Sequence, residues 1–218
     1  MCGYSQVKGF DYESTFSATL RSTSFRLLMA LAAGEGLSLD HFDVTNAFTQ
    51  SKIDAEIYVT PPKGFTDYDK NGKPKILKLK KALYGTKQAS RLWQETLSNY
   101  LIKELGFTQC KYDSCLYIKR KGEHVCMLGI YVDDIICAHN GDMLKWFKDK
   151  FTGDGGFNAK HLGKLSWFLG MAIDQSDSHV ITINQSQYID KLIKRFMPYK
   201  EGRKIEMSMP CNSSTFSN

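Results

Sequence analysis

The chain has 218 residues, of which 42% are hydrophobic and 24% charged, enough for a sizeable core in one large domain or two small lobes. No run approaches the roughly 20 apolar residues that a membrane-spanning helix needs, and the N-terminus lacks a signal-peptide pattern, so we expect an intracellular protein without a membrane partner. The formal net charge of +6 is compatible with a phosphate-bearing partner, and equally with a solvated basic face. The six cysteines show no CxxC or Cys/His spacing, which predicts reduced thiols.

Hydrophobic periodicity predicts the elements of the first half of the chain. Residues 7–16 show no clear periodicity and are interpreted as a loop that belongs to something upstream. Apolar residues then recur at helical spacing after Ser22 or Ser24, which predicts a helix that ends at Gly34. We expect next a strand over 37–44, a helical turn at 46–51, strands at 56–59 and 76–80 around a surface loop at 63–74, and a long helix over 89–105.

The second half of the chain mixes strands and helices without strict alternation. This pattern predicts an α+β fold with a largely antiparallel sheet. The expected elements are a hairpin of strands 115–119 and 125–131, a helix over 142–151 capped by Asp142, a hairpin of strands 165–173 and 180–183, and a helix over 186–197.

Two adjacent carboxylates interrupt the most apolar part of the sequence. Residues 127–138 read Met-Leu-Gly-Ile-Tyr-Val-Asp-Asp-Ile-Ile-Cys-Ala, which predicts two buried strands joined by a turn that carries Asp133 and Asp134. An unpaired buried carboxylate is costly, so the pair must be neutralised by protonation, by a basic partner or by a metal. We favour a divalent metal, because Asp43 ends another strand and could complete a two-metal site for phosphoryl transfer. A lone Asp-Asp pair can also be a plain turn or a helix cap.

Several motifs carry a family resemblance. Residues 131–134 (YVDD) resemble the YxDD box of reverse transcriptases, in the form usual in copia-type LTR retrotransposons. Residues 42–48 (FDVTNAF) are similar to the family's DVxxAF segment, and residues 79–93 (LKKALYGTKQASRLW) to its LKKALYGLKQAPRAW segment. Residues 167–170 (WFLG) resemble the LG turn of its primer grip, and matches in the family's order span about residues 4–196.

The resemblance implies a fold and an activity. It implies a right-hand polymerase palm with partial fingers over residues 1–198, followed over residues 199–218 by an irregular tail or the start of a lost thumb or connection. The implied activity is that of an RNA-directed DNA polymerase, a two-metal nucleotidyl transfer from dNTP to the 3′-hydroxyl of a primer with Mg²⁺ or Mn²⁺.

The resemblance also implies site residues. The catalytic, metal-binding carboxylates would be Asp43, Asp133 and Asp134, with the Val44 carbonyl completing one ion's shell. Phe48 would be a steric gate against the ribonucleotide 2′-hydroxyl, or else a core Phe. Implied for the nucleotide and template side are Tyr84, Gly85 and Lys87; for the primer grip Phe168, Leu169 and Gly170; and for the proton donor to pyrophosphate, or a phosphate contact, Lys160 or Lys164.

The implied partners are an RNA or DNA template with its primer, dNTPs, and the integrase and ribonuclease H of a retroelement polyprotein, in a cytoplasmic virus-like particle or the nucleus. The sequence departs from the family pattern because it begins after a basic fingers strand and has Thr86 and Ser90 where the family has leucine and proline. Two alternatives stay open. One is an inactive remnant that at most binds nucleic acid, and the other is a different two-metal palm enzyme, such as an RNA-dependent RNA polymerase or a nucleotide cyclase.

Overall fold

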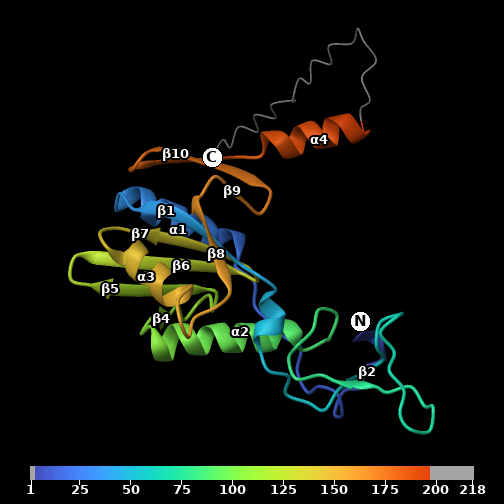
Figure 1. Ribbon diagram of the computed structural model, residues 1–218. Helices are drawn as coiled ribbons and strands as arrows, with labels where there is room; N and C mark the ends of the chain where they lie inside the picture. Colours follow the sequence, from blue (N-terminus) through green and yellow to red (C-terminus); the bar gives the residue numbers. More distant parts are fainter. Residues whose placement is uncertain (1–2, 197–218) are drawn as a thin grey trace, which may run out of the picture.

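The computed structural model describes residues 3–196, which form an α+β fold around a six-stranded antiparallel sheet (Figure 1). The strands lie in the order β4-β5-β6-β7-β1-β8, so that β1 is inserted between β7 and β8. Their bounds are β1 Ser38–Val44, β4 Thr108–Gln109, β5 Leu116–Lys121, β6 His124–Tyr131, β7 Asp134–His139 and β8 Ala159–Lys164.

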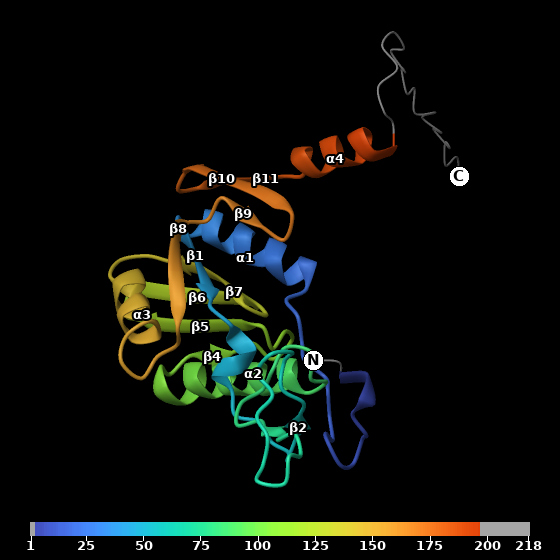
Figure 2. The ribbon, with the colours of Figure 1, turned by 45° about the vertical axis from the view of Figure 1, so that its right-hand side comes forward.

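Each face of the large sheet is covered by its own apolar layer (Figure 2). One layer is formed by α2 (Ala89–Asn99), its π-helical extension (Tyr100–Glu104) and α3 (Met143–Phe151). The other is formed by α1 (Ser22–Gly34) and a small sheet in the order β11-β10-β9. Strand side chains alternate between faces, so both layers bury part of every central strand. The bounds of the small sheet are β9 Trp167–Phe168, β10 Met171–Asp177 and β11 Val180–Asn184.

The predicted helices agree well with the structure. The helix that begins at Ser22 and ends at Gly34 is confirmed as α1, and the long helix predicted over 89–105 is α2 with its π-helical last turn. Asp142 is the N-cap residue of α3, as predicted, and its carbonyl accepts the Trp146 amide at 3.0 Å, but its side chain makes no capping hydrogen bond. Strands β4 and β8 were not predicted, since neither has an apolar alternation.

Smaller elements extend from this body. A short 3-10 helix lies at Gly3–Ser5 and another, η2, at Ala47–Gln50, while β2 (Tyr58–Val59) pairs with β3 (Leu77–Lys78) in a two-stranded sheet. Helix α4 (Ser186–Phe196) projects from the small sheet and buries none of its residues (Figure 1). Predicted residue 197 and the predicted tail at 199–218 lie outside the described residues.

Residues 7–16 pack closely on the start of α2, so they do not form a loop that belongs only to an upstream part. The Gln6 Nε2 atom donates to Gln88 Oε1 at 3.0 Å, and Gln88 Nε2 donates to the Asp11 carbonyl at 2.7 Å. Both glutamine side chains are buried. The Arg91 Nε atom also donates to the Ser14 carbonyl at 2.9 Å, so the segment is fixed by several polar contacts.

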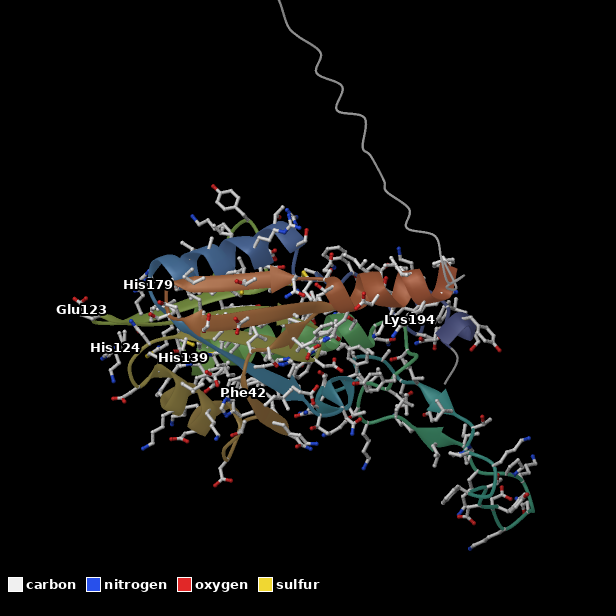
Figure 3. All side chains as sticks on the ribbon, turned by 90° about the horizontal axis from the view of Figure 1, so that it is seen from above. Phe42, Glu123, His124, His139, His179 and Lys194 are labelled. Carbon is white, nitrogen blue, oxygen red and sulfur yellow. The ribbon has the colours of Figure 1, made fainter. Side chains whose placement is uncertain are left out.

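The small sheet is fastened to α1 by a histidine. His179, in the turn between β10 and β11, places its Nδ1 atom 3.0 Å from the Ala33 carbonyl at the end of α1 (Figure 3). No helix within residues 3–196 is long and apolar enough to cross a membrane. Four of the six cysteines lie in the described chain as free thiols, as predicted: Cys110, Cys115, Cys126 and Cys137.

A buried carboxylate, unforeseen from the sequence, joins three strands of the large sheet. Asp40 on β1 lies 2.8 Å from His139 Nε2 on β7 and 2.6 Å from His161 Nε2 on β8. Figure 3 labels His139 beside the strand that carries Phe42. Burial raises the pKa of Asp40, but the hydrogen bonds from His139 and His161 outweigh burial and hold that pKa below its usual value.

We predict that Asp40→Asn lowers the free energy of unfolding by about 2 kcal/mol at pH 7, because hydrogen bonds to a charged group are each worth about 1.5–3 kcal/mol. A carboxyl group with a lowered pKa stabilises the fold above its unfolded-state pKa, and this stabilisation is lost as the pH falls through its folded-state pKa. Urea unfolding at pH 7 and about pH 3 checks this, and the gap between the wild type and Asp40→Asn should narrow in acid. The exposed Asp149→Asn is the control, and an equal gap at both pH values would contradict the prediction.

Candidate active site

The register of β1 against β7 brings two of the predicted carboxylates together. Asp43 lies directly opposite Asp134, and directly opposed residues of antiparallel strands project from the same face of a sheet. Tyr131 pairs with Asp134 across the β6–β7 hairpin, so the turn consists of Val132 and Asp133. The prediction that both aspartates occupy the turn is therefore wrong for Asp134, which is the first residue of β7.

The third carboxylate is attached to this pair through the backbone. The Val44 amide donates to the Asp133 carbonyl at 2.8 Å, so the hairpin turn is bound to the end of β1. The buried Trp93 of α2 donates its Nε1 hydrogen to the Val132 carbonyl at 2.8 Å, so it anchors the turn to the core. The turn is thus held from two sides.

Asp133 is electrostatically the most strained of the three. Its Oδ1 atom is buried and has no hydrogen-bond partner among the described residues, while Oδ2 accepts a hydrogen bond from the Tyr84 hydroxyl at 3.2 Å. Burial raises the pKa of Asp133, the Tyr84 hydrogen bond lowers it, and the charges of Asp134 and Asp43 raise it further, so that the net shift is upward. A nearby cation would offset the burial of the Asp133 carboxylate and its repulsion by Asp134 and Asp43.

Asp134 has a basic partner that sequence reasoning missed. The His41 Nε2 atom lies 2.8 Å from Asp134 Oδ1, and the His41 ring meets the edge of Phe168 at 6.0 Å between centroids. The available signal was that His41 stands two residues before Asp43, which puts both side chains on the same strand face. His41 therefore links the carboxylates to β9.

The residues predicted for the nucleotide side divide into two groups. Phe48 and Tyr84 lie together beside Asp133, with ring centroids 4.4 Å apart, and Tyr84 is 41% exposed. Gly85 follows with φ +94°, a left-handed conformation that favours glycine. Lys87 is instead engaged by the N-terminal segment, with Nζ 3.3 Å from the Tyr12 hydroxyl and 5.0 Å from that ring's centre.

The residues predicted for the primer side also differ in their exposure. Phe168 is buried and stacks on Phe25 with centroids 5.6 Å apart, so it anchors the segment from inside. Leu169 and Gly170 form the turn between β9 and β10, and Leu169 is 39% exposed. Of the three predicted primer-grip residues, Leu169 and Gly170 are therefore the ones that a ligand can reach.

The register also separates the two candidate lysines. Lys160 on β8 pairs directly with Asp43 and is exposed, whereas Lys164 donates from Nζ to the Gln175 carbonyl. Lys160 is therefore the lysine beside the carboxylates. Oxygen donors such as Asp43 and Asp133 suit a hard divalent ion. However, residues 3–196 contain no group of three or more His, Cys, Asp or Glu side chains arranged to hold a metal.

Comparison with known proteins now decides the family. A family model described as reverse transcriptase (RNA-dependent DNA polymerase) matches residues 1–205. The chain belongs to this family. Curated relatives include the Retrovirus-related Pol polyproteins from transposons RE1 and RE2 of Arabidopsis thaliana, which are 34% and 36% identical over 194 and 170 residues. A third, from transposon TNT 1-94 of Nicotiana tabacum, is 34% identical over 198 residues.

These matches confirm the predicted resemblance to copia-type reverse transcriptases. They cover 88%, 78% and 89% of this chain, but the chain spans only 13%, 11% and 14% of the length of those relatives. No solved structure is a significant match. By family, the chain is an RNA-directed DNA polymerase domain, and it is similar to one segment of these Pol polyproteins.

The reverse transcriptase YVDD turn carries backbone strain. Val132 has φ +56°, and a left-handed conformation costs a residue other than glycine about 1–2 kcal/mol. Asparagine tolerates this region better, so we predict that Val132→Asn raises the free energy of unfolding by about 1 kcal/mol, measured by urea unfolding. Val180→Asn, an exposed strand position without a positive φ, should show no such gain. A loss of stability in Val132→Asn would refute the strain argument.

Proposed function

We propose that residues 1–198 form a polymerase palm with partial fingers that performs RNA-templated DNA synthesis, by two-metal nucleotidyl transfer from dNTP to a primer 3′-hydroxyl. The observation that carries the proposal is the β1–β7 register, which sets Asp43 opposite Asp134 and beside the turn residue Asp133. In a member of the reverse transcriptase family, three carboxylates at adjoining strand ends favour this chemistry over a structural turn.

The proposed metal ligands are Asp43, Asp133, Asp134 and the Val44 carbonyl. The buried Oδ1 atom of Asp133, which has no hydrogen-bond partner in the described part of the chain, and the raised pKa of that residue fit a divalent cation at this position. When bound, Mg²⁺ or Mn²⁺ supplies activation of the attacking hydroxyl and stabilisation of the departing pyrophosphate. His41 orients Asp134 by its hydrogen bond, and Tyr84 orients Asp133.

The nucleotide and the primer would approach from opposite sides of the carboxylates. We assign the dNTP to the side of Phe48, Tyr84 and Gly85, where the two closely packed rings limit the room beside the sugar. We assign the primer 3′ end to the exposed Leu169-Gly170 turn, and Lys160 to the pyrophosphate. The Lys87 amine would reach the template or nucleotide only after it releases Tyr12 and the Gln6 carbonyl.

The wider setting follows from the relatives. Those relatives are named Pol polyproteins, so we propose that the domain works beside other retroelement parts, such as integrase and ribonuclease H, in a particle or the nucleus. A second candidate function is nucleic-acid binding without catalysis. The engagement of Lys87 by the N-terminal segment favours this second reading.

Primer extension on poly(rA)/oligo(dT) with Mg²⁺ or Mn²⁺ tests the proposal. We expect extension by the wild type, and a loss of at least about 100-fold in Asp133→Asn/Asp134→Asn, as is typical when transition-state charge stabilisation is removed. Hybrid binding without extension by the wild type, in both metals, would contradict the polymerase and support the binding module.

Phe48 offers a sharper test of the proposed substrate. Phe48→Ala removes the ring that faces Tyr84, so discrimination against rNTPs in primer extension should fall by at least about 10-fold, the size of effect that pocket shape supplies. Trp146→Ala is a matched control, because Trp146 is a half-buried ring on α3 that packs on Phe107 and Lys119 rather than on a predicted site residue. Equal discrimination in the wild type and Phe48→Ala would remove the gate assignment.

A further inference from the structure

The segment that leads into α1 carries an exposed aromatic ring on a fixed backbone. Phe16 is 79% exposed. Its neighbours are nevertheless tied to α2, since the Ala18 amide donates to Gln94 Oε1 at 2.8 Å and the Arg91 Nε atom donates to the Ser14 carbonyl at 2.9 Å. Because this backbone is already ordered, a ligand that stacks on Phe16 would lose little additional entropy.

A second exposed ring stands on an equally fixed turn. Tyr112 is 87% exposed in the turn that precedes β5. The next residue, Asp113, accepts hydrogen bonds from the Arg21 amide at 3.2 Å and from the Cys115 amide at 2.9 Å. The turn that carries Tyr112 is therefore bound to the segment that carries Phe16.

Two grooves meet at Phe16. The first has a volume of about 480 Å³ and contains both rings together with Arg21 and Lys111. The second, of about 450 Å³, runs along α2 past polar side chains that include Gln94, Ser98 and Asn99. Each volume falls within the range of ligand-sized sites. We call the two together the Phe16 groove.

The basic side chains that line the Phe16 groove include Arg21 and Lys111. Neither Arg21 nor Lys111 takes part in an ion pair within the part of the chain that the structure describes. The two acidic residues that line the groove are both engaged, Asp113 by backbone amides and Glu95 by Arg91 at 2.8 Å. The groove therefore combines aromatic rings and polar side chains with two cations, of which Arg21 is attracted to the nearby Asp113 and Lys111 has no ion-pair partner within residues 3–196.

We propose that the Phe16 groove binds a single-stranded segment of RNA or DNA outside the catalytic centre. Unpaired bases can stack on Phe16 and Tyr112, and phosphates can contact Arg21 and Lys111, a combination typical of sequence-tolerant single-strand binding. A duplex keeps its bases stacked internally and cannot use the rings in this way. Protein interfaces, by contrast, are depleted of lysine at their centre.

The Phe16 groove approaches the YVDD turn from the side of Val132 and Trp93. Its wall residues Ser17, Ala18 and Ser114 also line a small cavity of about 20 Å³ that reaches Val132 and Trp93. A strand in the Phe16 groove would thus pass the catalytic hairpin on its outer side. The inference depends on the proposed function in one respect, because the bound strand would be the template or product of the polymerase.

Fluorescence anisotropy of labelled oligo(rU) and oligo(dT) of about 12 nucleotides, without divalent metal or dNTPs, tests the groove, since such sites span about 4–16 nucleotides. We expect both oligonucleotides to bind the wild type, and Phe16→Ala/Tyr112→Ala to weaken binding about 10- to 100-fold, because stacking is worth about 1–3 kcal/mol per base. Lys111→Ala should reduce the salt dependence of binding by about one phosphate contact. Because no synthesis is measured, an inactive polymerase leaves this readout intact.

A matched control removes two comparably exposed rings elsewhere. Phe65 and Tyr68, 79% and 58% exposed in the loop before β3, should give unchanged affinity when both are replaced by alanine. Saturating unlabelled blunt-ended RNA–DNA hybrid, which has no single-stranded overhang to enter the groove, should not displace the labelled strand. Displacement by the hybrid, equal losses in the control, or no oligonucleotide binding by the wild type would each overturn the proposal, the last leaving the groove for a protein partner. Circular dichroism melting confirms that each variant folds.

Discussion

The pairing of β1 with β7 is the constraint on which the rest of the site depends. It sets Asp43 opposite Asp134 and leaves Phe42 on the other face, where it packs against Phe147 of α3. A slip of one residue would exchange these two side chains, because strand side chains alternate between faces. The Asp40 carboxylate holds this register, since it bonds histidines from both strands that flank β1. A buried polar cluster on one face thus fixes the geometry of the carboxylates on the other.

The hairpin turn breaks several local rules at once. It contains a β-branched residue with positive φ at Val132, a buried carboxylate atom of Asp133 that has no hydrogen-bond partner within residues 3–196, and a like charge beside it at Asp134. The apolar strands on either side of the turn are regular core strands, and β7 is buried from Ile135 onward. Such a concentration of unfavourable features in a well-packed environment is expected at a site retained for chemistry. The strain is borne by contacts outside the turn, above all the hydrogen bond from Trp93.

Elements that show a local hydrophobic pattern could be predicted from the sequence, whereas contacts between residues far apart in the sequence could not. Helix α1 and the apolar strands around the carboxylates were predictable, because periodicity is local and buried faces repeat it. Strand β8 was not, since its residues read Ala-Lys-His-Leu-Gly-Lys and its partner β1 lies about 120 residues away. His41 and the Asp40 cluster were missed for the same reason, because their partners are close only after the strands pair. The position of Asp43 at a strand end already suggested that it joins Asp133 and Asp134, and the motif resemblance led to the same three residues.

The segment before α1 shows how distant parts of the chain support one site. The Gln6 Oε1 atom accepts the Lys87 amide at 2.7 Å, and a Cβ atom at Gly3 would lie 2.2 Å from the Gly85 carbonyl, so only glycine permits this approach. These contacts fix the loop that presents Tyr84 to Asp133. The same segment turns Phe16 outward a few residues later. Its inner face therefore steadies the loop that carries Tyr84, while its outer face forms a wall of the Phe16 groove. One stretch of backbone does both because its hydrogen bonds to α2 hold it in place.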